Sequence, residues 1–128
     1  MTLRFISFSF FIMLIAVGVF LPQKAQAVRF SGEYLMKVCA LDRNGNERVR
    51  GGKVICQSYI SGVIDYHNTL RAMDLTSDMN FCIPNDETLN DIHIRVWAYM
   101  TRREKLHNQF VAAPGVAMAL FSFYPCKK

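Results

Sequence analysis

The sequence predicts an all-α fold, in which about four helices are held together by two disulfides behind a cleaved leader. Three observations support this prediction. Apolar residues recur at three- and four-residue spacing in several separate segments. No segment shows the alternating pattern and tight turns of β-hairpins. The chain also contains an even number of cysteines, all in its later part: Cys39, Cys56, Cys82 and Cys126.

Residues 1–27 predict a secretory signal peptide. Arg4 precedes an uncharged apolar run from Phe5 to Leu21, and Ala25-Gln-Ala27 provides a small-residue cleavage site. An uncleaved membrane anchor is the alternative, but the run is shorter than the roughly 20 residues that a spanning helix needs. Cleavage before Val28 leaves residues 28–128 as one domain with no membrane segment, and lowers the formal charge from +5 to +3. This charge is too small to indicate a nucleic-acid partner.

The cysteines predict disulfides rather than a metal site. An even number of cysteines in a small exported chain is typical of a disulfide framework. A zinc site would need closely spaced ligands such as Cys-x-x-Cys, and this sequence has no such pair. We therefore expect no cofactor and no metal.

The first helix is expected to begin after Ser31, whose hydroxyl can cap it, with Glu33 in its first turn. Its buried face is predicted to contain Tyr34, Leu35, Val38, Cys39 and Leu41. The following segment, 42–52, contains Asn-Gly and Gly-Gly turn formers and several arginines. We interpret it as a basic, solvated loop, with a surface for an acidic protein partner as the alternative.

The second helix is predicted over residues 53–75, with an apolar stripe formed by Ile55, Tyr59, Val63, Tyr66 and Leu70. Gly62 inside this helix costs about 1 kcal/mol relative to alanine. We expect another backbone to pack closely against it. Asp65 and His67 are two residues apart, so they point to different sides of a helix and do not form a catalytic pair.

The third helix is expected to begin at a capping box formed by Thr88 and Asp91, after a break that contains Pro84. Its buried face is predicted to contain Leu89, Ile92, Val96 and Tyr99. Ile94 and Trp97 lie off this face, so either a second side of the helix is buried or these residues meet a partner. Residues 101–108 form a polar, basic connection, and a last helix is predicted from Pro114 to Tyr124. The residues to which we assign structural roles are Tyr59, Gly62, Asp65, Pro84, Thr88 and Asp91.

An antiparallel arrangement of these helices predicts how the cysteines pair. The end of the first helix would lie beside the start of the second, which brings Cys39 near Cys56. The end of the last helix would lie beside the start of the third, which brings Cys126 near Cys82.

The sequence contains no pattern typical of a catalytic site. We find no Gly-x-Ser-x-Gly, no His-Glu-x-x-His, no phosphate-binding glycine loop and no calcium loop. A nucleophilic cysteine must be free, and each of the four cysteines has an expected partner. The protein is therefore predicted not to be an enzyme.

The order and spacing of several short motifs resemble the Rap/Tai family of periplasmic immunity proteins. Members of that family neutralise peptidoglycan amidases that rival or sister bacteria inject through the type VI secretion system. The motifs are Gly32-x-x-Leu35-x-x-x-Cys39, Cys56-x-x-Tyr59-Ile60-x-Gly62-x-x-Asp65, Cys82-Ile83-Pro84, the capped helix at Thr88, Ala119-Leu120 and Pro125-Cys126.

The resemblance implies a small, helical, non-enzymatic protein of the periplasm, often a homodimer, that binds an amidase and blocks its catalytic cleft. The alternative is a small periplasmic stress chaperone or another non-enzymatic binding protein. Because arginine and tryptophan are enriched at interfaces, we predict a partner-binding set from these residue types. The set comprises Arg48, Arg50, Arg95, Trp97, Arg102 and Arg103. The stretch from Cys56 to Asp65 is expected to serve packing rather than binding.

Overall fold

The computed structural model describes residues 30–76 and 78–126, so the predicted signal peptide and its cleavage site lie outside the described residues. Over this part the chain forms five helices and no strand. The helices are α2 (Gly32–Val38), α3 (Gly52–Ala72), α4 (Leu89–Arg102), α5 (Glu104–His107) and α6 (Ala112–Phe123). The all-α prediction is confirmed, and α5 is a short extra helix inside the polar connection. None of these helices combines the length and the apolar character that crossing a membrane requires.

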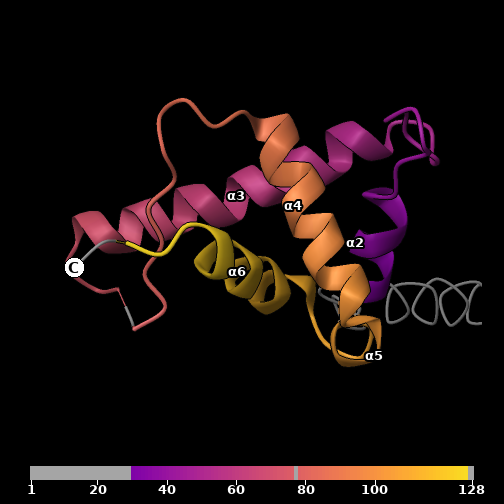
Figure 1. Ribbon diagram of the computed structural model, residues 1–128. Helices are drawn as coiled ribbons and strands as arrows, with labels where there is room; N and C mark the ends of the chain where they lie inside the picture. The colour runs from indigo at the N-terminus through magenta and orange to yellow at the C-terminus, as the bar shows by residue number, and fades with distance from the viewer. Residues whose placement is uncertain (1–29, 77, 127–128) are drawn as a thin grey trace, which may run out of the picture.

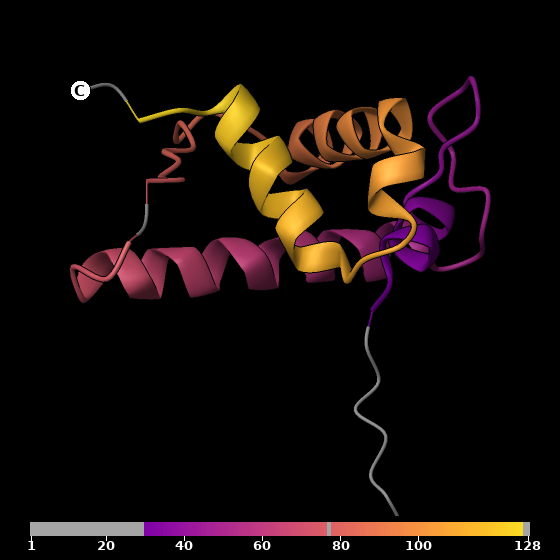
Figure 2. The same cartoon turned by 90° about the horizontal axis from the view of Figure 1, so that it is seen from below.

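The long helix α3 lies along one side of the molecule, and α4 and α6 pack together on the same side of it (Figure 1, Figure 2). Helix α2 lies near the N-terminal part of α3 and contacts α3, α4, α5 and α6. A single core fills the space between these helices. Its largest fully buried apolar side chains come from all four long elements: Leu35, Ile60, Val96, Met100, Val116 and Leu120.

Helix α2 begins as the sequence predicts. The backbone N–H of Tyr34 donates to the hydroxyl of Ser31 at 3.1 Å, which satisfies one of the free amides of the first turn. Leu35 and the other predicted apolar residues are buried, but Tyr34 is 46% exposed. Its ring meets the edge of Phe30, with centroids 4.8 Å apart, instead of entering the core.

Two carboxylates organise the α2–α3 loop (residues 39–51). Asp42 accepts hydrogen bonds from the backbone N–H groups of Asn44 and Asn46, each at 2.8 Å. Glu47 accepts from Gly51 at 2.8 Å and from Lys53 at 3.0 Å, and so caps the start of α3. These backbone bonds hold the pKa of both carboxyl groups below their ordinary values. The sequence suggested glycine turns here but did not reveal the capping role of Glu47.

Helix α3 buries a narrower face than predicted. Its buried residues are Gly52, Cys56 and Ile60, four residues apart, and they lie beside the predicted stripe; no residue of the stripe itself is fully buried, and Ile55 is 37% exposed. Tyr59, Val63 and Ile64 pack partly against that core. Tyr66 is 67% exposed, because α4 and α6 do not cover the outer part of the stripe.

The prediction for Gly62 is wrong. Gly62 is exposed, and a Cβ atom placed there would meet no atom within 4 Å. The close backbone approaches occur at two other glycines. A Cβ at Gly32 would collide with the carbonyl oxygen of His107, and one at Gly52 would collide with that of Val38. Gly62 therefore has no packing function among the residues described.

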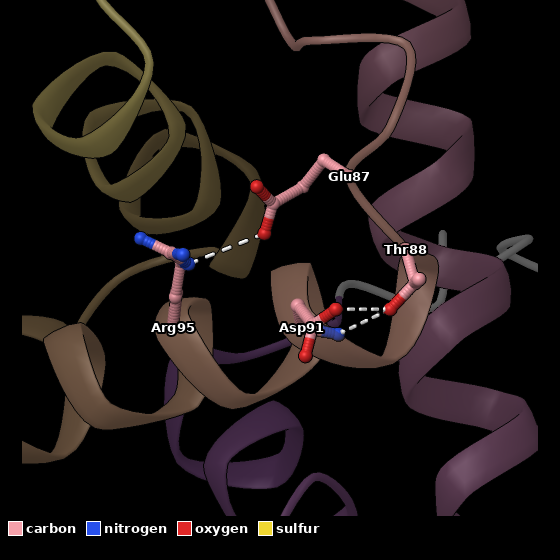
Figure 3. Close-up of polar contacts among 4 residues, drawn as sticks. All are labelled: Glu87, Thr88, Asp91 and Arg95. Atoms are coloured by element: carbon pink, nitrogen blue, oxygen red, sulfur yellow. Dashed lines mark hydrogen bonds and ion pairs between the residues drawn. The ribbon is translucent and has the colours of Figure 1, made fainter.

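The capping box of α4 is confirmed, with one difference in detail. The backbone N–H of Asp91 donates to the hydroxyl of Thr88 at 3.1 Å. The carboxylate of Asp91 reaches back to the same hydroxyl (Figure 3). Of the predicted buried face, Ile92 and Val96 are buried and Tyr99 is partly buried, whereas Leu89 at the start of the helix is exposed. The sequence did not indicate that His93 would be fully buried beside them.

Both predicted disulfides are present. Cys39–Cys56 joins the end of α2 to the first turns of α3 inside the core. Cys82–Cys126 joins the segment before α4 to the end of α6. There the backbone N–H of Cys82 donates to the carbonyl of Tyr124 at 2.8 Å, so the two segments are also held by a main-chain hydrogen bond.

Substitution by alanine should have opposite effects on stability at the two glycines of α3, Gly52 and Gly62. Gly62→Ala should stabilise the protein by about 1 kcal/mol, because alanine has the higher helix propensity and its methyl group meets open space. Gly52→Ala should destabilise it by about 1–3 kcal/mol, because its Cβ collides with the Val38 carbonyl. Urea unfolding followed by circular dichroism measures both changes. A loss of stability in Gly62→Ala would contradict the exposed position.

Removing either disulfide should destabilise the fold substantially. The Cys82–Cys126 bond spans 44 positions, and loop-closure entropy assigns it about 4 kcal/mol. The Cys39–Cys56 bond spans 17, for which the same relation gives about 3 kcal/mol. The double alanine variants should show these losses in urea unfolding. Unchanged unfolding midpoints would show that neither bond constrains the unfolded chain.

Candidate partner-binding surface

The six residues predicted to bind a partner lie in three separate places. Arg48 and Arg50 belong to the α2–α3 loop, Arg95 and Trp97 lie on α4, and Arg102 and Arg103 lie where α4 ends. The α2–α3 loop and α5 lie at opposite ends of α2 (Figure 1). The structure therefore does not bring the six residues together into one patch.

The α2–α3 loop presents charge without an apolar anchor. Arg48 and Arg50 are both exposed. Arg48 contributes to the low pKa of Asp42, and Arg50 contributes to that of Glu47, so each arginine already has an acidic neighbour within the loop. Within the loop, Leu41 is buried and Val49 is partly buried, and the nearest exposed apolar side chains, Val54 and Ile55, belong to α3. The two arginines are thus exposed to solvent, but the neighbouring carboxylates offset part of their positive charge.

Arg95 makes contacts within the protein. Its Nε atom lies 3.3 Å from Oε1 of Glu87 (Figure 3). Its guanidinium carbon lies 5.8 Å from the ring centroid of Phe123 and 5.6 Å from that of Tyr124, within the range of cation–π attraction. Burial and the nearby Glu87 raise the pKa of the Tyr124 hydroxyl. Arg95 therefore ties the segment before α4 to the end of α6.

Trp97 does not provide an exposed anchor. Its side chain is partly buried and packs against the core formed by α4 and its neighbours. The sequence left open whether this second side of α4 is buried. The structure buries it partly at Trp97, whereas Ile94 is exposed.

The third place combines charge with apolar surface. We call residues 101–111 the α4–α6 connection; it includes the last two residues of α4 and all of α5. Arg102, Arg103 and Lys105 are exposed there, and so are Leu106 (50%) and Phe110 (60%). Residues 101–106 line a shallow hollow of ≈ 480 Å³. Leu106 and Phe110 were missed from the sequence, although two large apolar residues in an otherwise polar stretch were a usable signal.

A buried histidine anchors the α4–α6 connection to the rest of the fold. The His107 side chain is buried against Gly115, where a Cβ atom would lie 3.0 Å from its Nδ1 atom. The backbone N–H of Gly32 donates to the carbonyl of Phe110, and that of Ala112 donates to Phe30, both at 2.8 Å. Burial lowers the pKa of His107, with a smaller contribution from Arg103. The connection is therefore fixed at its base and exposed at its surface.

A separate groove runs between α3 and the start of α6. It has a volume of ≈ 540 Å³ and is lined by small and apolar residues: Ser58, Tyr59, Gly62, Val63, Tyr66, Ala113, Pro114 and Ala117. Gly62 lines this groove, where a Cβ atom would meet no atom within 4 Å. The stretch from Cys56 to Asp65 therefore contributes to the accessible surface as well as to packing, and its expected lack of a binding role stays a prediction.

One cluster of described residues has the chemistry of metal ligands. Cys39, Cys56 and His93 are buried, and their ligand atoms lie within 4.8 Å of one another. The two sulfurs are joined in a disulfide, whereas metals bind cysteine as the thiolate. The Nε2 atom of His93 lies 2.8 Å from the Cys39 carbonyl oxygen, which can only accept, so this nitrogen donates. The cluster therefore holds the fold together.

Asp65 and His67 do not form a pair, as the sequence predicted. His67 stacks on Phe81 with ring centroids 3.8 Å apart, and its Nε2 atom lies 3.0 Å from Oδ1 of Asn80. This histidine fixes the segment around Cys82 against α3. It is a structural residue.

The family model of the Rap1a immunity proteins matches residues 31–126 of this chain. The chain belongs to the Rap1a immunity protein family. The match begins at the helix cap Ser31 and ends at Cys126, so it spans all five described helices and both disulfides. No curated protein and no solved structure matches the chain.

Membership confirms the resemblance seen in the sequence motifs. A Rap1a immunity protein has an immunity function against a secreted effector and binds that effector as its partner. The family is typically non-catalytic and usually periplasmic. A surface that binds a protein is therefore the site to look for.

The buried His107 makes the stability of this Rap1a protein depend on pH. Its folded-state pKa lies below the ordinary value of 6.5, so the unfolded chain takes up a proton at a higher pH than the folded one. Stability should be full above pH 6.5 and should fall as the pH drops toward the folded-state pKa. Between pH 7 and about 5.5, His107→Gln should show a smaller loss in urea midpoint than the wild type. Equal slopes would contradict a histidine buried in its neutral form.

Proposed function

We propose that this Rap1a protein is a periplasmic immunity protein that binds a peptidoglycan amidase effector of the type VI secretion system and blocks its catalytic cleft. The observation that carries the proposal is the family match over residues 31–126. Because the match covers the whole described fold, the immunity function is assigned to this domain and not to a part of it. The sequence motifs that resemble the Rap/Tai family supply the amidase as the proposed target.

The disulfides support a periplasmic location. Bonds of this kind form and persist in oxidising compartments, and are rare in the reducing cytosol. All the cysteines of the chain are used in the two bonds. Together with the leader expected in residues 1–27, this supports export of the mature chain.

The chemistry of the surface supports inhibition by binding. The buried histidines act in the fold: His93 donates to a main-chain carbonyl, and His107 anchors the α4–α6 connection. The exposed surface instead offers arginines beside large apolar side chains, a composition that protein interfaces favour. A homodimer, which the resemblance implies, stays a prediction, and the apolar α3–α6 groove is a surface on which it can be tested.

The proposal is tested with the mature chain and an exported cysteine–histidine amidase, sought first among the genes beside its own. The purified chain should bind this amidase saturably and abolish its cleavage of peptidoglycan. Expression of the chain in the periplasm should prevent the lysis that the periplasmic amidase causes. A variant with both disulfides removed serves as the control for native structure, and should not protect.

A general stress chaperone would behave differently in the same assay. It would suppress aggregation of an unrelated unfolded protein and would show no preference for the amidase. Protection of unfolded clients without amidase binding would therefore replace the immunity proposal with the chaperone alternative. Failure to bind the amidase at all would reject the proposed target.

A further inference from the structure

We infer that the α4–α6 connection, residues 101–111, is the element that contacts the effector, and that its counterpart is an apolar pocket with an acidic rim. This inference rests on the proposed function, and it deepens that function by selecting one surface and the chemistry of its partner. Of the three places that contain the predicted interface residues, this connection alone combines uncompensated charge, exposed apolar anchors and a fixed backbone.

The charge of the connection is positive and is not neutralised locally. The stretch contains three cations, Arg102, Arg103 and Lys105, and a single acid, Glu104. Within residues 30–76 and 78–126 the one ion pair is between Arg95 and Glu87, so none of these three cations has an ion-pair partner there. Arg103 lies over the ring of Tyr99, 4.5 Å from its centroid, which holds its guanidinium in place. Cations held in this way are suited to a carboxylate on a partner.

Apolar side chains flank these charges. Phe110 is 60% exposed and Leu106 is 50% exposed, and Val111 is also exposed beside them. Large side chains of this kind lose contact with water when they enter a pocket, and such central anchors carry most of the binding energy of an interface. Phe110 and Leu106 therefore supply the anchors that Trp97, partly buried in the core, does not supply.

The backbone under these side chains is fixed before any partner arrives. Phe110 accepts from Gly32, and Ser31 pairs with Val111 in an isolated β-bridge. His107 is buried between them and α6, and Gly32 leaves no room for a Cβ beside the His107 carbonyl. A binding loop that is already ordered loses less conformational entropy on association, which favours affinity.

The other surfaces lack one of these properties. The α2–α3 loop has exposed arginines that also have no ion pair among the described residues, but Asp42 and Glu47 balance part of their charge. Residues 39–51 present no exposed large apolar side chain, and the nearest ones, Val54 and Ile55, belong to α3. Arg95 is engaged with Glu87 and two aromatic rings. The α3–α6 groove is lined by residues without formal charge, so it has no means of selecting an acidic partner.

The charge half of the inference is tested by charge reversal at matched sites. The mature Arg102→Glu/Lys105→Glu variant should bind the amidase identified above at least about tenfold more slowly at low salt, because rim charges act on the association rate. Arg48→Glu/Arg50→Glu makes the same change in charge on the α2–α3 loop, and should leave the rate within about twofold. Equal slowing by both variants, or slowing by the control alone, would overturn the inference.

The apolar half is tested by truncating two exposed aromatic side chains. Phe110→Ala should raise the Kd for the same amidase by about thirtyfold or more, as expected for an interface anchor. Tyr66→Ala, which removes a ring of similar exposure (67%, against 60% for Phe110) from the α3–α6 groove, should change Kd little. Circular dichroism melts verify that both variants fold. A large effect of Tyr66→Ala with none of Phe110→Ala would place the contact in the groove and overturn the inference.

Two further outcomes are distinct. If the wild-type chain does not bind the amidase, the proposed function fails, and the inference fails with it. If the wild type binds and every connection variant binds equally well, the function stands and the inference alone is overturned.

Sedimentation with phosphatidylglycerol vesicles tests whether the basic and apolar connection binds a membrane instead. Vesicle binding that is lost in Phe110→Ala, with amidase binding retained, would also overturn the inference.

Discussion

The fold depends on the contacts that converge on Cys39. This residue ends α2, its sulfur is bonded to Cys56 in α3, and its carbonyl accepts a hydrogen bond from His93 in α4. Three helices are therefore joined at one buried point by a covalent bond and a polar bond. A buried carbonyl left without a donor would cost about 1–3 kcal/mol, so His93 is as much a part of this junction as the disulfide. The domain, residues 31–126, is small and has a small core, and such junctions limit the number of ways in which its helices can pack.

Features governed by local chemistry were predictable from the sequence. The caps Ser31 and Thr88 form as expected, because their hydroxyl groups need only the first turn of their own helix. The pairing of the cysteines was also predictable, because antiparallel neighbours place one helix end beside the next helix start. Glu47 shows where this reasoning ends. It caps α3 from five residues before the helix begins, and its contacts depend on a loop shape that no spacing rule describes.

Features governed by packing between distant segments were predicted less well. The apolar pattern of α3 showed that one side is buried, but not which edge of that side meets α4 and α6. The true contact line passes through Cys56 and Ile60, and Gly62 faces solvent instead of another helix. His93 and His107 illustrate the same limit in α4 and α5. Each is buried because a particular carbonyl or glycine from elsewhere lies beside it, and neither neighbour can be inferred from the local sequence.

The same distinction applies to the binding surface. Residue type alone selected three regions, and only the structure shows that their arginines differ: those of the α2–α3 loop lower the pKa of Asp42 and Glu47, Arg95 is paired with Glu87, and Arg103 beside α5 lies over the ring of Tyr99. The α4–α6 connection lies at the other end of α2 from the α2–α3 loop (Figure 1). The disulfide-bonded junction at Cys39 and the proposed contact element are therefore separated by the length of α2, about 10 Å for its 7 residues. Because side chains 102, 105, 106 and 110 take no part in that junction, their identity can change with the partner while the core and its disulfides keep the same fold.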